Sequence, residues 1–334
     1  MQQVERYYSL WFPVLSHRVS RIFLTMPALA LFLTLNAPLL NGQGDGGTRY
    51  RVDVDMVVLT FSVIDKKGNH VNGLRPEDIR IFEDGAEQKI ASFAEGGKLL
   101  VKEGAGSAGT NVFILFDTSN RMYASIPYVC DAVADFVRRL APADSSAIYT
   151  FSRNLFRATP LTQDHNMARA GLSNISAGDD TALFNSLLLT IRDAARVPGR
   201  KAIVVFSNGP DNASVLGPED VGRVAENEGI PIYVISTRDA TQDRTLFNAL
   251  QRLTSRTGGK LYCARNWQQQ AEAFTSVRED IGSSYTLYYY PSPNPNHGYR
   301  NIRVEVVSPS GKGYHILSRS GYEAGRETPG ATNN

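Results

Sequence analysis

The stretch at residues 111–121, NVFILFDTSNR, decides the fold of this chain. Its apolar part, residues 112–116, is continuous and rich in residues that favour β-structure. Such a run is typical of a short strand that is buried on both faces. The run stops at Asp117, and small polar residues follow it. We therefore expect a buried strand that opens into a polar loop at its carboxyl end.

A helix is predicted shortly after this loop. Apolar residues between Ile126 and Leu140 recur at helical spacing and fall on one face. Ser125 is the expected N-cap, and Pro127 is tolerated in the first turn of a helix. Strand, polar loop and helix form the first unit of a parallel α/β sheet, in which ligands bind at the carboxyl ends of the strands. Every α/β domain has such loops, but here a carboxylate and two hydroxyl groups follow the strand directly.

The same alternation continues to about residue 283. Further strands are predicted by short apolar runs at 147–151, 202–206, 232–235 and 260–263, with a possible edge partner at 155–157. Between them lie helical patterns at 166–174, 183–194, 218–228, 246–257 and 274–281. Strands that alternate with helices at this spacing predict a doubly wound, mostly parallel sheet over residues 108–283.

Two β-rich segments flank this α/β unit. Before it, strands are expected at 57–64, 79–83 and 89–93, with a hairpin turn at Asp84-Gly85 and a linker at 96–109. After it, strands are expected at 285–290, 302–306 and 314–317, and residues 323–334 are expected to be a disordered tail. Neither flank has enough strands for a stable core alone. We therefore predict that 48–97 and 284–322 pair into one β-sandwich, with the α/β domain inserted between them.

Length and charge narrow the class of protein. A chain of 334 residues has room for about two domains. Its formal charge of +2 is carried by residues 1–40, and the rest of the chain is neutral. The basic footprint of a nucleic-acid-binding protein is therefore absent. The cysteines, Cys130 and Cys263, allow either one disulfide or two free thiols.

The N-terminal segment, residues 1–43, resembles an export signal. Arg18 and Arg21 precede the short apolar run at 22–35, and small residues follow near Ala37. A basic flank, a short apolar core and small residues predict a secretory signal peptide, and an uncleaved membrane anchor is the alternative. The chain is expected outside the cytoplasm, periplasmic or secreted. Contact with a membrane is expected only through this segment.

Three polar motifs give the α/β unit a family resemblance. Residues 117–121, DTSNR, resemble the Asp-x-Ser-x-Ser loop of von Willebrand factor type A domains. Thr181 matches the threonine of that family's second loop, and residues 207–212, SNGPDN, resemble its third loop. The motifs occur in the family's order and on the expected loops. Together with both flanks, the chain also resembles the bacterial von Willebrand factor A-related family described from Acidobacteria.

This resemblance implies a metal-ion-dependent adhesion site and a Rossmann-like fold. The family holds magnesium with hard oxygen ligands, and an acidic group of the bound protein completes the shell. The family's ligands that remain in this chain are Asp117, Ser119 and Thr181. Arg121 stands at the second serine, and a guanidinium has donors only and cannot ligate a cation. Asn208 stands at the second aspartate and lacks its charge.

Three interpretations of this site stay open. The site binds magnesium weakly, or it is a relic without a cofactor, or Arg121 replaces the metal. In the last case Arg121 would pair with Asp117 or Asp180 and meet an acidic group of a partner directly. The residues expected to bind a ligand are Asp117, Ser119, Arg121, Asp180, Thr181, Asn208 and Asp211.

The sequence offers little for catalysis. His165 is the only histidine of the α/β unit, and it follows Asp164 in an expected surface loop, where such pairs are usually just solvated. No Gly-rich phosphate loop follows the first strand. Tyr288, Tyr289 and Tyr290 are either sandwich core or an exposed sticky patch. We therefore expect an exported, non-enzymatic protein-binding or adhesion module. The alternative is a structural protein of the cell envelope whose α/β unit only packs, and a hydrolase ranks third.

Overall fold

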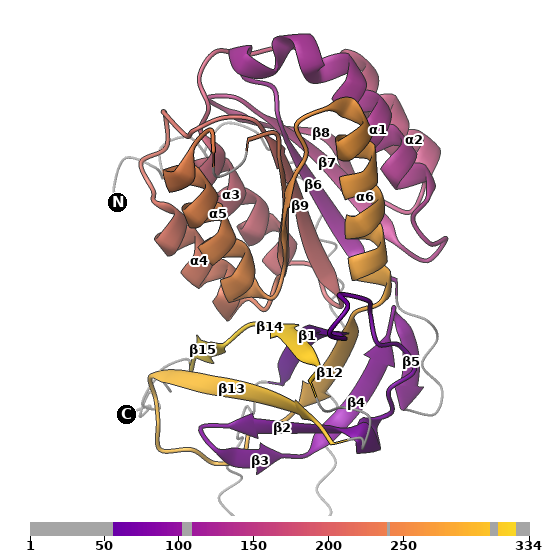
Figure 1. Cartoon of the computed structure of the whole chain (residues 1–334), viewed down its shortest axis with the longest axis vertical. Helices are drawn as coiled ribbons and strands as arrows, with labels where there is room; N and C mark the ends of the chain where they lie inside the picture. The colour runs from indigo at the N-terminus through magenta and orange to yellow at the C-terminus, as the bar shows by residue number, and fades with distance from the viewer. Residues whose placement is uncertain (1–55, 102–108, 239–240, 308–312, 325–334) are drawn as a thin grey trace, which may run out of the picture. The chain divides into compact units, whose positions relative to one another are not determined.

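The computed structural model of the chain describes residues 56–101, 109–238, 241–307 and 313–324 (Figure 1). The predictions for the N-terminal segment at 1–43 and for most of the tail at 323–334 lie outside the described residues. Within the described residues, none of the helices combines the length and the apolar character needed to span a bilayer.

The α/β unit is built on one six-stranded sheet with strand order β11-β10-β9-β6-β7-β8. All neighbouring strands are parallel except β7 and β8, which are antiparallel. The strands are β6 (Asn111–Asp117), β7 (Ser145–Phe151), β8 (Leu155–Thr162), β9 (Lys201–Ser207), β10 (Ile232–Ser236) and β11 (Leu261–Cys263). The predicted doubly wound, mostly parallel sheet is confirmed.

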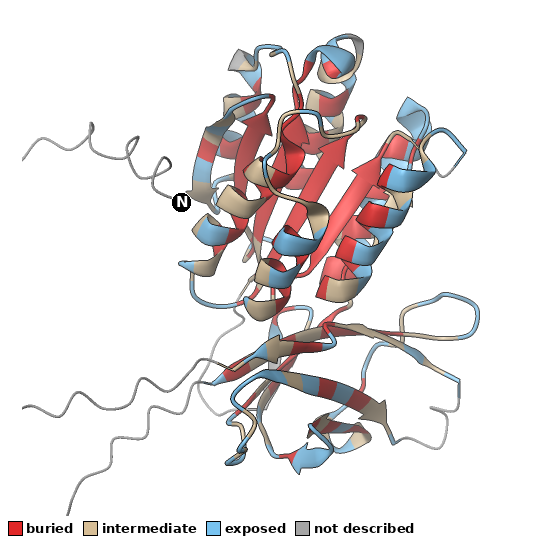
Figure 2. Ribbon diagram, turned by 90° about the vertical axis from the view of Figure 1, so that its left-hand side faces the viewer, coloured by how far each residue is buried: buried red, intermediate tan, exposed pale blue. Residues whose placement is uncertain are grey.

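Helices cover both faces of this sheet (Figure 1). One face carries α1 (Ile126–Arg138), α2 (His165–Ala170) and α6 (Trp267–Gly282), and the other carries α3 (Leu183–Ala195), α4 (Pro218–Asn227) and α5 (Arg244–Thr257). In β6, the side chains of Val112, Ile114 and Phe116 pack into the core beneath α1, α2 and α6. Those of Phe113 and Leu115 pack into the core beneath α3, α4 and α5. Figure 2 shows the resulting layer of buried strands. The continuous apolar run of this strand is thus explained by burial on both faces.

The start of α1 differs from the prediction in one respect. A short 3-10 helix, η3 (Asn120–Ser125), runs directly into α1. Ser125 therefore has helical backbone angles, and its side chain does not cap the helix. The fully buried Met122 anchors η3, whereas Arg121 and Tyr123 on either side of it are exposed. This turn fixes the position of Arg121 beside the end of β6.

The flanks form two antiparallel sheets that share one core. The five-stranded sheet has the order β14-β1-β12-β4-β5, and the four-stranded sheet has the order β15-β13-β2-β3. Their strands are β1 (Val57–Ile64), β2 (Ile79–Glu83), β3 (Ala86–Gln88), β4 (Ile90–Glu95), β5 (Lys98–Val101), β12 (Tyr285–Tyr289), β13 (Tyr299–Val306), β14 (His315–Ser318) and β15 (Gly321–Glu323). Each sheet takes strands from both flanks, so the predicted pairing of the flanks is confirmed.

Details of this sandwich depart from the predictions. The strand expected at 89–93 is present as β4, which pairs with β12, but a further short strand, β3, precedes it and pairs with β2 in the other sheet. The expected linker at 96–109 begins with β5, and β15 reaches into the expected tail. Of the three tyrosines, Tyr289 is fully buried, whereas 56% of Tyr290 is exposed. Only Tyr289 therefore fits the sandwich-core interpretation fully. The predicted domain boundaries themselves stay predictions.

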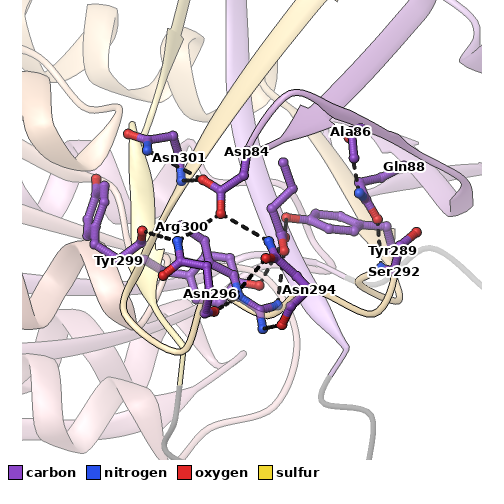
Figure 3. A network of polar contacts seen from close by, with 12 residues as sticks. Asp84, Ala86, Gln88, Tyr289, Ser292, Asn294, Asn296, Tyr299, Arg300 and Asn301 are labelled. Atoms are coloured by element: carbon purple, nitrogen blue, oxygen red, sulfur yellow. Dashed lines mark hydrogen bonds and ion pairs between the residues drawn. The ribbon is translucent and has the colours of Figure 1, made fainter.

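Asp84 ties the loop after β12 to the β2–β3 turn (Figure 3). Its carboxylate accepts hydrogen bonds from the side-chain amides of Asn294 at 3.0 Å and Asn296 at 2.9 Å. It also accepts the backbone N–H of Asn301 at 2.9 Å. These donors favour the ionised carboxylate, with Asn296 contributing most, and lower the pKa of Asp84 from 3.8 to about 2.

The low pKa of Asp84 predicts a pH dependence of stability. Because the folded-state pKa lies below the ordinary value of 3.8, its stabilisation is present above pH 4 and is lost as the pH falls toward 2. Asp84→Asn should therefore reduce the slope of unfolding free energy against pH between about 4 and 2. Urea titrations at a series of pH values measure this slope, with the exposed Asp220→Asn as the control. An unchanged slope in Asp84→Asn would contradict this assignment.

Candidate functional site

Three polar loops meet at the carboxyl ends of β6 and β9. The two strands are parallel neighbours, and Phe116 is paired with Phe206. The next residues, Asp117 and Ser207, therefore lie side by side. The loop that precedes α3 joins them, because the backbone N–H of Gly178 donates to the carbonyl of Thr118 at 2.8 Å.

Asp117 is the central carboxylate of this site and is fully buried. One of its oxygens accepts the backbone N–H of Ser119 at 2.8 Å, and the other accepts the hydroxyl of Ser207 at 2.7 Å. Burial raises the pKa of Asp117, and the hydrogen bond from Ser207 partly opposes this effect. Both carboxylate oxygens are thus held by donors within the protein.

Two buried oxygen atoms beside Asp117 lack hydrogen-bond partners among the described residues. They are the hydroxyl of Ser119 and the side-chain carbonyl of Asn208. The Ser119 hydroxyl lies close enough to the carboxylate of Asp117 to lower its pKa, yet it has no partner at good hydrogen-bond geometry. The amide nitrogen of Asn208 donates to the carbonyl of Arg121 at 2.6 Å. Buried polar atoms are nearly always paired, so these two oxygens have hydrogen-bonding capacity left for a water molecule or a bound group.

Gly209 marks the point where the loops approach one another. A Cβ atom built on Gly209 would lie 3.6 Å from Cδ of Arg121 and 3.7 Å from the hydroxyl of Thr181. The third loop also fixes Thr181, because the side-chain oxygen of Asn212 accepts the Thr181 N–H at 2.8 Å. The structure therefore brings five predicted residues together: Asp117, Ser119, Arg121, Thr181 and Asn208.

The two other predicted acidic residues are engaged elsewhere. The carboxylate of Asp211 accepts the N–H of Phe184 at 2.9 Å in the first turn of α3, and the N–H of Ser214 at 2.8 Å. Asp180 pairs with Arg153 and accepts a hydrogen bond from Asn212. Both carboxylates therefore organise the loops. The pairing of Arg121 with Asp117 or Asp180 does not occur among the described residues, because other donors occupy both acids.

These residues fit a magnesium ion poorly. The site offers one carboxylate against the two positive charges of the ion, and both of its oxygens already accept hydrogen bonds. Its other oxygens are neutral, and the side chain of Arg121 lies beside them. The described part of the chain holds no cluster of three or more His, Cys, Asp or Glu suited to a metal ion. Whether the site holds a cofactor stays a prediction.

The remaining candidates lie away from this site. Asp164 caps α2 by accepting the N–H groups of Asn166 and Met167, and His165 is the first residue of that helix. A ring nitrogen of His165 lies 3.4 Å from the carbonyl of Asp144, at the start of β7 and thus at the opposite end of the sheet. Cys130 and Cys263 are both free, so the disulfide alternative is not realised.

Sequence reasoning missed two residues that shape the loops. Ser207 holds the carboxylate of Asp117, and Asn212 joins the second and third loops. Both lie in the third-loop motif, but neither was proposed as a site residue. Short polar side chains at strand ends favour local hydrogen bonds of this kind, which is the signal that could have identified them.

The fold and the loops define a doubly wound α/β domain with a polar site at the carboxyl ends of its strands. The sequence model of the von Willebrand factor type A domain matches residues 111–276, and the α/β unit of this chain is a von Willebrand factor type A domain. The narrower relation to the Acidobacteria family stays a prediction. No curated protein matches the sequence significantly.

Several solved structures are similar to parts of this chain. One is an aerotolerance-related membrane protein from Bacteroides fragilis, with 19% identity and a TM-score of 0.44, covering 52% of this chain and 98% of that one. A von Willebrand factor type A protein from Catenulispora acidiphila has 11% identity and a TM-score of 0.46, covering 85% and 78%. The corresponding domain of the pilus tip protein Mfa5 from Porphyromonas gingivalis has 13% identity and a TM-score of 0.44, covering 53% and 96%. At these values the likeness carries no information about function.

Proposed function

We propose that this chain is an exported, non-enzymatic module that binds a protein partner through an acidic group of that partner. The observation that carries the proposal is that Arg121 is exposed and makes no ion pair among the described residues. Its side chain is exposed at the meeting point of the three loops, beside Gly209. It makes no ion pair with any acidic residue in the described ranges.

The chemistry of the site favours a carboxylate as the bound group. A guanidinium offers two parallel N–H groups that match a carboxylate in geometry and charge. The Ser119 hydroxyl, which lacks a partner among the described residues, supplies a further donor close by. Arg121 thereby takes over the role of the metal, and neither magnesium nor another cofactor is part of the proposed contact.

Two further parts of this proposal rest on other observations. Export rests on the basic flank and short apolar run of the N-terminal segment. The absence of catalysis rests on His165, which lies at the opposite end of the sheet from the loops. The competing proposal is an envelope protein whose α/β unit only packs against neighbours, and it predicts that the loops do not matter for binding.

Charge reversal at Arg121 tests the proposal. Arg121→Glu should remove partner capture from the envelope fraction of the source cells, because like charges at an interface cost several kcal/mol. The matched control is Arg192→Glu, the same change at an exposed arginine near the other end of α3. Capture is measured with the tagged full chain by quantitative mass spectrometry, with and without a chelator.

The outcomes separate the alternatives. Proteins lost with Arg121→Glu but kept with Arg192→Glu and with the chelator support the proposal. An identical set of captured proteins for Arg121→Glu and the wild type contradicts it and favours the packing alternative. Loss of capture upon chelation contradicts the replacement of the metal by Arg121.

A further inference from the structure

Exposed apolar side chains gather around the same loops. Among the described residues ten large apolar side chains are exposed, and half of them follow the carboxyl ends of strands in the six-stranded sheet or lie next to such an end. We call these five the apolar collar: Tyr123, Tyr128, Phe156, Val215 and Trp267. Single exposed apolar residues need no explanation, but a concentration at one end of a domain does.

Each collar residue is placed by the fold. Tyr123 is in η3 and Tyr128 is in the first turn of α1, both directly after β6. Phe156 pairs with Thr150 near the end of β7, and Trp267 begins α6 after β11. Val215 is in the third loop after β9, and its N–H donates to the side chain of Asn185 at the start of α3. The collar thus spans the sheet from β8 to β11.

Arg121 lies within this collar. Tyr123 and Arg121 flank the buried Met122 in one turn of η3, so both side chains leave the protein from the same short segment. Val215 lies in the third loop, whose Asn212 and Ala213 donate their N–H groups to the carbonyl of Thr181. The exposed fractions are 72% for Tyr123, 62% for Tyr128 and 92% for Val215, so more than half of each residue is available to a partner.

We infer that Tyr123, Tyr128 and Val215 are specificity-determining contacts for a protein segment that presents a carboxylate flanked by apolar side chains. The inference rests on the proposed function, in which Arg121 binds that carboxylate, and it adds the residues beside it. Aromatic anchors next to a buried charge pair are the usual composition of binding hot spots. Arg121, which makes no ion pair among the described residues, sets the charge of the occupant, and the exposed Tyr123 beside it in η3 sets an apolar flank.

The charges around the collar disfavour a membrane as the occupant. Attachment to anionic lipid needs several basic side chains, each contributing about 1 kcal/mol. Near the loops, Arg153 is paired with Asp180, and Asp179 is an exposed acid. A surface on which Arg121 lies near an exposed acid fits one carboxylate of a protein better than an anionic lipid surface.

The test measures binding of four pools of short synthetic peptides with randomised outer positions. Their centres are aspartate with leucine or phenylalanine neighbours, aspartate with serine neighbours, and the two corresponding asparagine pools. The full chain should bind the first pool at least about tenfold more tightly than the others, the size of one hot-spot contact. Fluorescence polarisation gives the affinities.

Variants distinguish this inference from the proposed function. Replacing Tyr123, Tyr128 and Val215 by serine should abolish the preference for apolar neighbours and keep the preference for aspartate. Arg121→Gln should abolish the preference for aspartate. Tyr290→Ser, at an exposed tyrosine after β12, is the matched control and should change neither.

Three results would overturn the inference. If the triple serine variant keeps the apolar preference while Arg121→Gln loses the aspartate preference, the collar is wrong and the proposed function stands. If no pool binds at millimolar concentration, both are wrong. If anionic phosphatidylglycerol vesicles sediment the wild type but not the triple variant, the collar binds lipid and the protein partner is wrong.

Discussion

Replacing Glu83 by alanine is expected to destabilise the β-sandwich by about 3–5 kcal/mol, the range for removing one partner of a buried ion pair. Only 1% of the Glu83 side chain is exposed. Its carboxylate accepts hydrogen bonds from the hydroxyls of Tyr289 at 2.8 Å and Tyr322 at 2.9 Å, and from Arg300 at 3.0 Å. Alanine would leave a largely buried guanidinium and two hydroxyl groups without their acceptor.

The loss of stability should affect both flanks of the β-sandwich. Glu83 ends β2 in the first flank, whereas its three donors all come from the second flank. Losing this carboxylate therefore weakens the attachment of the two flanks to each other. Limited proteolysis of Glu83→Ala should cleave within 56–101 while 111–276 stays resistant.

Urea unfolding of the full chain measures the loss of stability. Glu77→Ala removes a carboxylate of the same flank that is 59% exposed and should cost less than about 1 kcal/mol. Glu83→Gln keeps the shape and some of the hydrogen bonds and should fall between the two variants. A cost for Glu83→Ala as small as that of Glu77→Ala would show that the two flanks are not joined by this carboxylate.

Long regular elements could be predicted from the sequence because their signals are local. The continuous apolar run of β6 and the alternating apolar residues of β1 and β13 show within one segment which residues are buried. The short strands β3, β5 and β15, of three or four residues each, gave no such signal. They are too short to show an alternation of buried and exposed residues: β3 and β5 pair with β2 and β4 directly before them, and β15 pairs with β13.

For the candidate site, the sequence named the loops but not every side-chain contact between them. The motifs named Asp117, Thr181 and Asn208, and the structure brings the loops that carry them together, because β6 and β9 are neighbours in the sheet. The motifs could not show that Asp180 pairs with Arg153. That contact joins side chains from two different loops. The sequence of neither loop indicates whether Arg121 or Arg153 is the partner of Asp180.

The second large effect is expected at the metal position. The wild-type chain should bind magnesium no better than millimolar, and the double variant Arg121→Ser with Asn208→Asp should bind it at least about tenfold more tightly. Arg121 places a positive charge beside the three loops, where it opposes a second cation. Asn208 has the shape of the missing aspartate but not its charge.

The double variant changes the charge of the site in favour of a divalent cation. It removes one positive charge and adds one negative charge, while Asp117, Ser119 and Thr181 stay on their loops. The new serine supplies a neutral oxygen in place of a donor-only group. The side-chain carbonyl oxygen of Asn208 is buried and unpaired among the described residues, so Asn208→Asp adds its charge at the same side chain.

Isothermal titration calorimetry with magnesium and manganese measures the gain. Each single variant should show less than the full effect, because each corrects only part of the charge. Adding Asp117→Asn to the double variant should abolish binding, which checks that the ion sits on these loops. Micromolar binding by the wild type would show that other oxygens complete the shell and that Arg121 does not replace the metal. A folded double variant that binds neither ion would show that the three loops do not form the site that their motifs imply.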